Sequence, residues 1–485
     1  MPFFYALMRA SEAGWQGVLS ELMRPMTREL LANTLILATS VTIASGVMAI
    51  AAAWCTERCD LPARGFLRVI ASLPLSLPAF VSSYAWASLG PWFQGMAGAI
   101  LILSLASMPL IYLPMAAALR GMDPAFEEVA RGLGGGRWRI LLRIVLPQAA
   151  PALGGGALLV SSHMLAEFGA LSFLSVQTFT TAIFQQYDLQ FDNASAALLS
   201  SVLMALCLPL AFGELYLRKG RRRARVARGN ARQPAPAKLS TLQKIIALAG
   251  FTLFAALSVG VPFVTMLYWL IQGTSIGQGV ERLWPALMGS LAYSLPGGLL
   301  ITLLALPLVL ASMRASGLFV VLAERLPYLV HGLPGLVIAL ALIYVAIRHA
   351  PMLYQTPALV FAAYVMLFLP LAQSAIRASA ELIPPELEDV ARSLGKGPIT
   401  AFLRVTLPAL ASGLGASLAM VVLQLMRELT ATLLLAPSGV TTLATEFWSY
   451  TNDRAYAAAA PFAALLVLAS GLPVYIFTVR SLPKS

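Results

Sequence analysis

The chain has 485 residues, of which 59% are hydrophobic and only 11% are charged. Because soluble proteins carry about 25% charged residues, composition excludes a soluble globular fold, a disordered chain, a coiled coil and a disulfide scaffold. It predicts an integral membrane protein with many spans. The net charge of +12 is concentrated in residues 218–244, which hold ten basic residues and no acidic one. Such a block is a topology signal beside membrane helices, so nucleic-acid binding is not expected.

Long apolar segments recur along the whole chain. A helix needs about 20 apolar residues to cross the hydrocarbon core of a bilayer. The segments that meet this requirement are Leu31–Trp54, Val69–Gly90, Met96–Leu119, Ala150–Leu174, Ala194–Leu217, Ile245–Gln272, Met288–Met313, Leu326–Ile347, Met352–Ile376, Ala409–Pro437 and Ala455–Val479. They predict an all-α membrane protein with about eleven transmembrane helices, five in a first half and six in a second.

Basic loops fix the expected orientation, because loops rich in Lys and Arg stay in the cytoplasm. The block at 218–244 and the basic loops at 131–143 and 392–404 are therefore expected inside, and Arg480 places the C-terminus inside as well. This would place Met1 outside. Residues 1–8 resemble residues 261–268 in the sixth span. We therefore expect that the first half begins within a first span, either because the start is assigned too late or because that helix was lost.

The chain contains an internal repeat. Residues 127–134 match residues 388–395 at an offset of 261, and Leu77-Pro78 matches Leu333-Pro334 at an offset of 256. The repeat predicts a first half at 1–217, a flexible basic linker at 218–244 and a second half at 245–485. Since both repeated loops are expected inside, the halves should be parallel, as in transporters whose repeats are related by an axis along the membrane normal.

Each repeated loop has the pattern of a short helix. Asp123 is a good N-cap, Pro124 suits the first helical position, and Gly134 can supply a left-handed residue at the C-terminal end. Each helix would carry an apolar stripe, made of Phe126, Val129 and Leu133 in the first copy and Leu387, Val390 and Leu394 in the second. One copy could equally pack on the chain's own helix ends or dock a partner. Two copies favour two docking sites for two copies of a cytoplasmic partner.

The spacing Glu128-x-Ala130-x3-Gly134-x9-Ile144-x-Leu146-Pro147 resembles the E-A-A motif of permease subunits in binding-protein-dependent ABC importers. The second copy departs from the motif only mildly. In that family the loop is the coupling helix, which sits in a cleft of the nucleotide-binding subunit. The resemblance implies that the residues that couple to the ATPase are Glu127, Glu128, Ala130, Gly134, Pro147, Glu388, Asp389, Ala391, Gly395 and Pro408.

The resemblance also implies the partners. The chain lacks the G-x4-G-K-[ST] run that cradles phosphates, so we expect it not to be an enzyme and to bind no cofactor. ATP and Mg²⁺ would be used by two copies of a separate ATPase. One periplasmic or extracellular binding protein would deliver the substrate to this subunit in the inner (plasma) membrane. The three histidines are scattered and the three cysteines are expected to be free thiols, so no metal site is predicted.

The fusion of two permease halves in one chain resembles ferric-iron and thiamine importers. The segment 428–435, followed by 442–445, looks most like ferric-iron permeases, so ferric iron is the expected substrate. Thiamine or another small solute is the alternative. A secondary transporter built from two parallel halves is a further alternative. A membrane enzyme ranks last, because no catalytic arrangement is visible in the sequence.

Ionisable residues inside membrane spans are functional candidates, and the clearest are Glu167, Arg427 and Glu428. Glu167 and Glu428 are equivalent by the repeat. They could form a gate or a vestibule ring, or they could be carboxylates that reach the external interface or pair with a neighbour. The position that matches Arg427 in the first half is Ala166. This asymmetry suggests a closed gate in which Arg427 bridges the two carboxylates.

Overall fold

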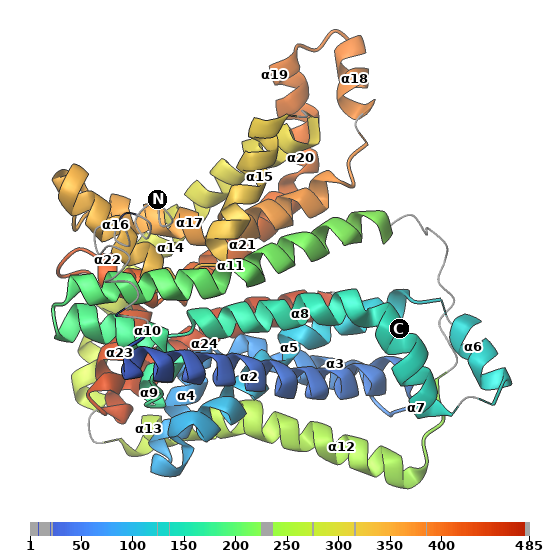
Figure 1. Cartoon of the computed structure of the whole chain (residues 1–485). Coiled ribbons are helices and arrows are strands. Elements are labelled where there is room, and N and C mark those ends of the chain that lie inside the picture. Colours follow the sequence, from blue (N-terminus) through green and yellow to red (C-terminus); the bar gives the residue numbers. More distant parts are fainter. Residues whose placement is uncertain are drawn as a thin grey trace. The chain divides into compact units, whose positions relative to one another are not determined.

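The computed structural model describes Met8, Ser20 and residues 23–123, 125–134, 136–224, 236–273, 276–314, 317–384 and 386–480. Every regular element in these ranges is a helix (Figure 1). The chain forms two compact units. The larger unit comprises Arg9–Gly277 with Tyr450–Ser485, and the smaller comprises Met1–Met8 with Gln278–Ser449. This architecture confirms the all-α membrane class.

The larger unit is built around a long first helix that packs along two others, α5 and α8. With 34 residues, α2 is about 50 Å long and exceeds a bilayer core of about 30 Å, so one of its ends projects beyond the core. The helices of this unit are α2 (Pro25–Arg58), α3 (Arg64–Ser72), α4 (Ala79–Ser88), α5 (Gly95–Gly121), α6 (Ala125–Gly132), α7 (Arg137–Ile140), α8 (Leu146–Ala166), α9 (Gly169–Phe173), α10 (Phe179–Phe184), α11 (Asn193–Ala224), α12 (Thr241–Ala255), α13 (Val261–Gln272) and α24 (Tyr456–Arg480).

The smaller unit repeats the same order: a long helix, a broken span, a second long helix, a short loop helix and a third span. Its helices are α14 (Ile276–Arg314), α15 (Leu318–His331), α16 (Gly335–His349), α17 (Pro357–Ala380), α18 (Glu386–Ser393), α19 (Pro398–Ala401), α20 (Leu407–Ala409), α21 (Ala411–Met426), α22 (Thr430–Leu435) and α23 (Leu443–Asn452).

Two predicted spans are broken in the middle rather than continuous. The helices on either side of Leu77-Pro78 are bent by 85°, and those on either side of Leu333-Pro334 by 110°. Proline removes a helical N–H donor and forces the residue before it into extended backbone. Leu77 has φ −102° and ψ 121° accordingly. The same dipeptide therefore breaks the equivalent span in both halves.

Two other predicted spans end earlier than expected. The segment Ala150–Leu174 is helical only to Ala166, and the segment Ala409–Pro437 only to Met426; each is followed by a short separate helix. The helix that leads into α21 is also bent, by 62°. Seven helices can cross a membrane on their own, and the three bent pairs raise the number to ten among the described residues. The apolar run in α24 is consistent with an eleventh span, and the count of eleven stays a prediction.

Small and hydroxyl-bearing residues join the long helices of each unit. In the larger unit, a Cβ at Gly156 would lie 2.9 Å from the Cα of Ile111, and the hydroxyls of Thr42 and Ser161 lie 2.9 Å apart. In the smaller unit, the hydroxyls of Thr302 and Ser417 lie 3.1 Å apart. Small residues let membrane helices approach closely, and hydroxyl pairs add interhelical hydrogen bonds. Equivalent helix pairs therefore use the same means of contact.

Helices α13 and α24, from the predicted second half, pack in the larger unit against α4. The indole Nε1 of Trp269 donates a hydrogen bond of 2.9 Å to Ser88, and its ring lies 5.6 Å from that of Tyr456. Tyr84 OH donates to the Tyr456 carbonyl at 2.6 Å. The larger compact unit thus contains helices from both predicted halves. Those boundaries describe the sequence repeat and stay a prediction.

The structure describes both ends of the predicted linker, residues 218–224 and 236–244. Helix α11 continues to Ala224, past the expected end of the first half, because basic residues are good helix formers. Residues 225–235 lie outside the description. From Pro236 the chain returns to α2, where the Ala237 N–H donates to the Arg58 carbonyl at 2.8 Å. The flexible tether over 218–244 stays a prediction, and the structure describes a helical end at 218–224 and a segment at 236–244 that contacts α2.

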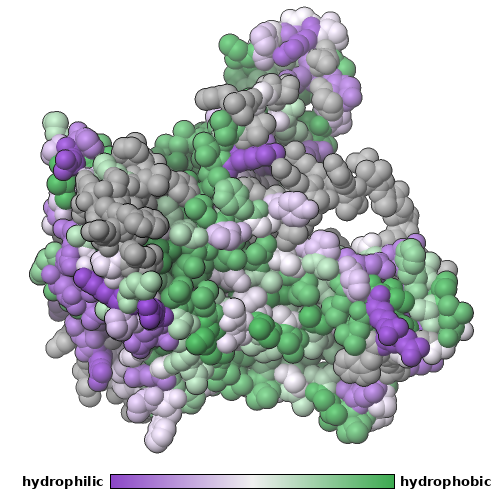
Figure 2. Space-filling view, viewed as in Figure 1, coloured by the Kyte–Doolittle hydropathy of each residue, from purple (hydrophilic) through white to green (hydrophobic). Residues whose placement is uncertain are grey.

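The surface of the helices is largely apolar. Figure 2 shows hydrophobic side chains over much of the visible face. Among the exposed large side chains are Ile43, Leu253 and Leu303, each on a long helix. An aqueous surface would not tolerate apolar patches of this extent, so these helix faces suit contact with lipid.

Candidate functional site

The first repeated loop forms the helix α6 with the predicted ends. Asp123 Oδ1 accepts a hydrogen bond of 2.9 Å from the Ala125 N–H, as an N-cap does. At the other end Gly134 has φ +76°, and its N–H donates to the Arg131 carbonyl at 3.0 Å. Among the described residues other than its chain neighbours, no heavy atom lies within 4 Å of a Cβ built on Gly134. Glycine is thus required here by the backbone angle and not by crowding.

The second loop forms the helix α18 with the same C-terminal end. Gly395 has φ +79°, and the Lys396 N–H closes the helix on the Ala391 carbonyl at 3.1 Å. The left-handed glycines predicted from the sequence are therefore confirmed in both copies. Pro124 and its counterpart Pro385 lie outside the described residues.

The apolar stripes of both loop helices are open to solvent. The side chains in question are all exposed, up to 84% for Leu133 and 75% for Leu394. They are Phe126, Val129 and Leu133 on α6 and Leu387, Val390 and Leu394 on α18. The described chain therefore does not bury either stripe on its own helix ends. Exposed patches of this kind on a helix mark interaction sites.

Glu127 faces its own chain and not the solvent. Its Oε1 accepts a hydrogen bond of 2.8 Å from the Nε of Arg58, the last residue of α2, and the two side chains are 3% and 1% exposed. Arg131, one turn along α6, lies 3.4 Å from the other oxygen. Glu127 thus anchors α6 to α2. Of the other predicted coupling residues on α6, Glu128 is exposed and Ala130 is partly exposed.

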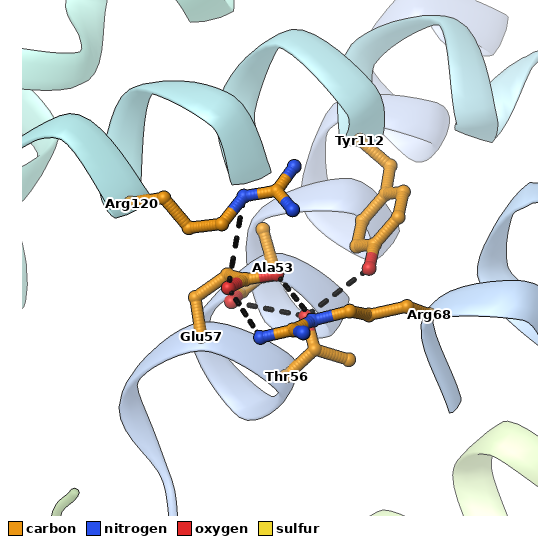
Figure 3. A network of polar contacts seen from close by, with 6 residues as sticks. All are labelled: Ala53, Thr56, Glu57, Arg68, Tyr112 and Arg120. Atoms are coloured by element: carbon orange, nitrogen blue, oxygen red, sulfur yellow. Dashed lines mark hydrogen bonds and ion pairs between the residues drawn. The ribbon is translucent and has the colours of Figure 1, made fainter. Parts of the chain in front are cut away.

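A second ion-pair network holds the end of α2 in place (Figure 3). Glu57, beside Arg58, accepts hydrogen bonds of 2.8 and 2.9 Å from Arg68 on α3, and Arg120 on α5 lies 4.0 Å away. The neighbouring residue Thr56 also contacts α5, because its hydroxyl lies 3.2 Å from that of Tyr112. Bidentate arginine–carboxylate contacts fix geometry as well as charge. Helices α2, α3 and α5 are therefore joined at the end of α2, next to Arg58, which binds Glu127 of α6.

The corresponding carboxylate on α18 has different neighbours. Glu388 Oε1 accepts a hydrogen bond from the Thr406 hydroxyl, and Arg392 lies 4.0 Å from Oε2. The Glu388 side chain is 18% exposed, against 3% for Glu127. Ala391 is buried, and the side chain of Asp389 lies outside the description. Both loop helices are thus attached through an acidic residue, but the second attachment is more open to water.

Pro147 and Pro408 stand at the start of the helices that follow the loops. Each is the second residue after a π-helical turn, η3 (Leu141–Val145) or η7 (Phe402–Thr406). Proline has no N–H to offer the carbonyl four residues before it and clashes with that carbonyl, which favours a local widening of the helix. The repeated prolines therefore shape the stems that carry the two loop helices, and they lie outside the apolar stripes.

Glu167 ends α8 and caps the short helix α9. Its Oε1 accepts a hydrogen bond of 3.0 Å from the Ala170 N–H, and His163 Nε2 lies 3.6 Å from Oε2. The Thr180 hydroxyl donates to the Glu167 carbonyl at 2.6 Å. Because the carboxylate is 10% exposed, these contacts compensate for its removal from water.

Glu428 caps the short helix α22 in the same way, with more donors. Its carboxylate accepts hydrogen bonds of 3.0–3.1 Å from the N–H groups of Ala431 and Thr432 and from the Thr432 hydroxyl. Glu167 and Glu428 belong to different compact units. Their meeting on one axis, bridged by Arg427, therefore stays a prediction, whereas their role as helix caps is a finding.

The anchor residues Arg58 and Glu57 were missed by the sequence analysis. The available signal was weak: both are charged residues that come directly after the apolar run of the first span. Their partners lie 69 residues away for Arg58 and 11 residues away for Glu57. Nothing in the local pattern identifies such partners.

Comparison with known proteins gives the same repeat. A family model described as the binding-protein-dependent transport system inner membrane component matches residues 45–223 and again residues 303–484. The two matched ranges each contain one of the loop helices, α6 and α18.

Individual relatives cover the chain to different extents. The Fe(3+)-transport system permease protein FbpB 2 of Haemophilus influenzae is 42% identical over 478 residues, which cover 98% of this chain and 94% of that protein. The sulfate transport system permease protein CysT of Escherichia coli is 29% identical over 46% of this chain. The molybdenum transport system permease protein ModB of Escherichia coli is 32% identical over 36% of it. These two relatives are themselves covered to 88% and 85%.

Proposed function

This chain belongs to the family of inner membrane components of binding-protein-dependent transport systems. Within this family, we propose that its substrate is ferric iron. The chain is a multi-pass permease of an ABC importer and not an enzyme, and it works with a substrate-binding protein and an ATPase. The observation that supports iron is the likeness to an Fe(3+)-transport permease over nearly the full length of both chains. The sulfate and molybdenum permeases resemble less than half of the chain.

Substrate identity is tested by uptake in a strain that lacks this permease and carries it on a plasmid, together with its binding protein and ATPase. We expect the plasmid to restore uptake of radioactive ferric iron in an ATP-dependent manner. An excess of unlabelled sulfate, molybdate or thiamine should leave this uptake unchanged. Restored sulfate, molybdate or thiamine uptake without iron uptake would contradict the proposal.

We further propose that α6 and α18 are the coupling helices and that two copies of the ATPase dock on them, one on each apolar stripe. ATP and Mg²⁺ are then used in those subunits. The support for this proposal is the occurrence of two exposed stripes with the same glycine end. The coupling loops and the C-terminus would lie in the cytoplasm, and one binding protein would dock on the opposite side.

Docking is tested by charge insertion into each stripe. Val129→Asp and Val390→Asp place a charge on an apolar contact, so each variant should lose one of the two copurifying ATPase copies and the double variant both. Quantitative protein staining of the detergent-purified complex gives the ratio. Met352→Asp is the matched control, because Met352 is an exposed apolar residue of the short 3-10 helix Pro351–Leu353, on the opposite side in this topology. A normal ratio in the double variant would overturn the proposed docking.

We also propose a pathway role for the two capping carboxylates. Glu167 and Glu428 are equivalent carboxylates in the two halves, and each lies where a predicted span breaks into a short helix. Irregular backbone at membrane depth is tolerated where it lines a cavity or is buried in protein. We propose that these two breaks flank the pathway, with Arg427 beside Glu428.

A further inference from the structure

The end of the linker is bound to the end of α2 by a compact set of hydrogen bonds. The Ala237 N–H donates to the Arg58 carbonyl at 2.8 Å, and the Asp60 N–H donates to the Ala237 carbonyl at 3.2 Å. Asp60 Oδ1 accepts from the Leu239 N–H at 2.7 Å, and Asp60 Oδ2 accepts from Lys244 Nζ at 2.8 Å. We call this set, made by Asp60, Ala237, Leu239 and Lys244, the linker clasp.

The clasp joins the end of α2 to the start of α12. On one side is Arg58, whose side chain holds α6 through Glu127 and whose carbonyl holds Ala237. On the other side is the start of α12, where Ser240 accepts from the Gln243 N–H and Gln243 accepts from the Ser240 N–H. This capping box fixes the direction in which the chain enters α12. Lys244, which closes the clasp, already belongs to α12.

The path continues from α12 to the broken span of the first half. Helix α12 packs on α3, and α13 packs on α4. These are the two helices on either side of the break at Leu77-Pro78. A continuous set of contacts therefore links α6 to both arms of this broken span: the Arg58–Glu127 ion pair, two backbone hydrogen bonds, and the helices α12 and α13. Coupling between distant sites requires contiguous contacts of this kind or a shared two-state element.

The clasp occurs once in the chain, because the linker occurs once. The position that matches Asp60 at the offset of 256 is Ser316, which offers no carboxylate to an ammonium group. The second half thus has no sequence equivalent of the clasp, although the coupling helices themselves are repeated.

We propose that the linker clasp is a positioning device that ties the first coupling helix to the entry helix of the second half, so that movement of α6 is transmitted to α12 and α13. This inference rests on the proposed function of α6. Asp60 and Lys244 are positioning residues and touch neither the substrate nor the ATPase. Their loss should therefore reduce the amount of substrate moved per ATP hydrolysed while the ATPase still binds and turns over.

The first test measures transport and ATP hydrolysis in proteoliposomes that contain the full complex. Asp60→Ala removes both side-chain contacts, and Lys244→Met removes the ion pair alone. We expect the ratio of transport to hydrolysis to fall by about fivefold in Asp60→Ala, the lower end of typical coupling between sites, and by less in Lys244→Met. Asp453→Asn, an exposed aspartate on the loop before α24, is the matched control and should keep the wild-type ratio.

The second test measures the positioning directly. Spin labels at the exposed residues Gly132 and Leu242, in a variant whose native cysteines are replaced by serine, report the distance between α6 and α12. We expect one narrow distance distribution that shifts as a unit on ATP binding. Asp60→Ala should broaden this distribution and uncouple the shift.

An unchanged transport-to-hydrolysis ratio together with an unchanged distance distribution in Asp60→Ala would overturn the proposed role of the clasp. The spin-label measurement does not depend on substrate identity. If the wild-type complex hydrolyses ATP but moves no iron, the proposed substrate fails while the clasp is still judged by the distance distribution.

Discussion

The two loop helices, α6 and α18, carry the same apolar stripe and end at equivalent left-handed glycines, but their inner carboxylates are held in different ways. Glu127 forms a buried ion pair with Arg58. Glu388 accepts from a threonine hydroxyl, has Arg392 at 4.0 Å and is more exposed. The exposed surface of the loop helix is thus the same in both halves, whereas its attachment to the rest of the chain differs.

The largest difference between the halves should follow from removal of the two inner carboxylates. Glu127→Ala leaves the Arg58 cation buried without its partner, which costs about 3–5 kcal/mol, whereas Glu388→Ala opens a site that water can reach. We expect Glu127→Ala to abolish uptake and to lower the amount of folded protein in the membrane, and Glu388→Ala to reduce uptake in part.

The control for this comparison is a double variant, Arg58→Met with Glu127→Leu, which replaces the buried pair by apolar groups of similar size. Such replacements are often neutral for stability. Membrane levels should therefore recover, as measured by fluorescence size-exclusion chromatography. Equal loss in Glu127→Ala and Glu388→Ala would remove the distinction between the two anchors.

The glycines should give equal effects in the two halves. A side chain in the left-handed conformation costs roughly 1–2 kcal/mol, and both Gly134 and Gly395 have positive φ without steric neighbours. Gly134→Asp and Gly395→Asp should each reduce ATPase copurification to a similar degree, and the double variant should uncouple transport while the permease stays in the membrane.

Asparagine and aspartate both adopt positive φ more readily than most residues, so Gly134→Asn and Gly395→Asn are the matched controls that lack the added charge, and they should be milder than the aspartate variants. A tenfold difference between the two single aspartate variants would show that the loop ends are not equivalent. Normal transport by the double aspartate variant would contradict the docking proposal.

Substitution of the capping carboxylates Glu167 and Glu428 should change the stability of the permease by a smaller amount. The larger change is expected for Glu428, in the second half. Glu428 accepts more hydrogen bonds than Glu167, and bonds to a charged acceptor contribute about 1.5–3 kcal/mol. Glu428→Gln should therefore lower the melting temperature of the purified permease more than Glu167→Gln.

Uptake separates a structural cap from a pathway residue in the same variants. Loss of iron uptake with retained ATPase activity and melting temperature would support the pathway. Unchanged uptake in the Glu167→Gln, Glu428→Gln double variant would reduce both residues to helix caps.

The smallest effect concerns the pH dependence of the clasp, for which the second half has no sequence equivalent. The ammonium of Lys244 and the N–H of Leu239 hold the pKa of Asp60 below its usual value. Because the folded-state pKa is lowered, the stabilisation is complete above the unfolded value of about 4 and is lost only as the pH falls through the folded value. The transport-to-hydrolysis ratio of Asp60→Asn relative to the wild type should therefore be constant from about pH 6 to pH 8. A ratio that changes across this range would show that another titrating group controls the clasp.

The sequence predicted the positions of the spans well, because hydrophobic length is a direct requirement of the bilayer. It did not predict the broken spans, although Leu77-Pro78 and Leu333-Pro334 were visible as a repeated pair. A proline inside an apolar run can either kink a helix or end it, and neighbouring helices decide which occurs.

The site was predictable where it depends on local geometry and not where it depends on distant contacts. Asp123 and Gly134 act on atoms within their own turn, so their roles could be read from spacing. Glu127 and Glu128 are adjacent acids on one short helix, and only the position of Arg58 decides which of them is buried. The grouping of α13 and α24 with the larger unit was also hidden, since one apolar span resembles another in sequence.

The packing of α24 in the larger unit has a consequence for biogenesis. Helices α2 to α13 leave the ribosome early, yet the surface of α4 that receives Tyr456 is completed only when the last span has been inserted. Until then the contact of Tyr84 with Tyr456 cannot form. A nonsense mutation near the end of the gene would therefore damage the oldest part of the nascent chain rather than the youngest.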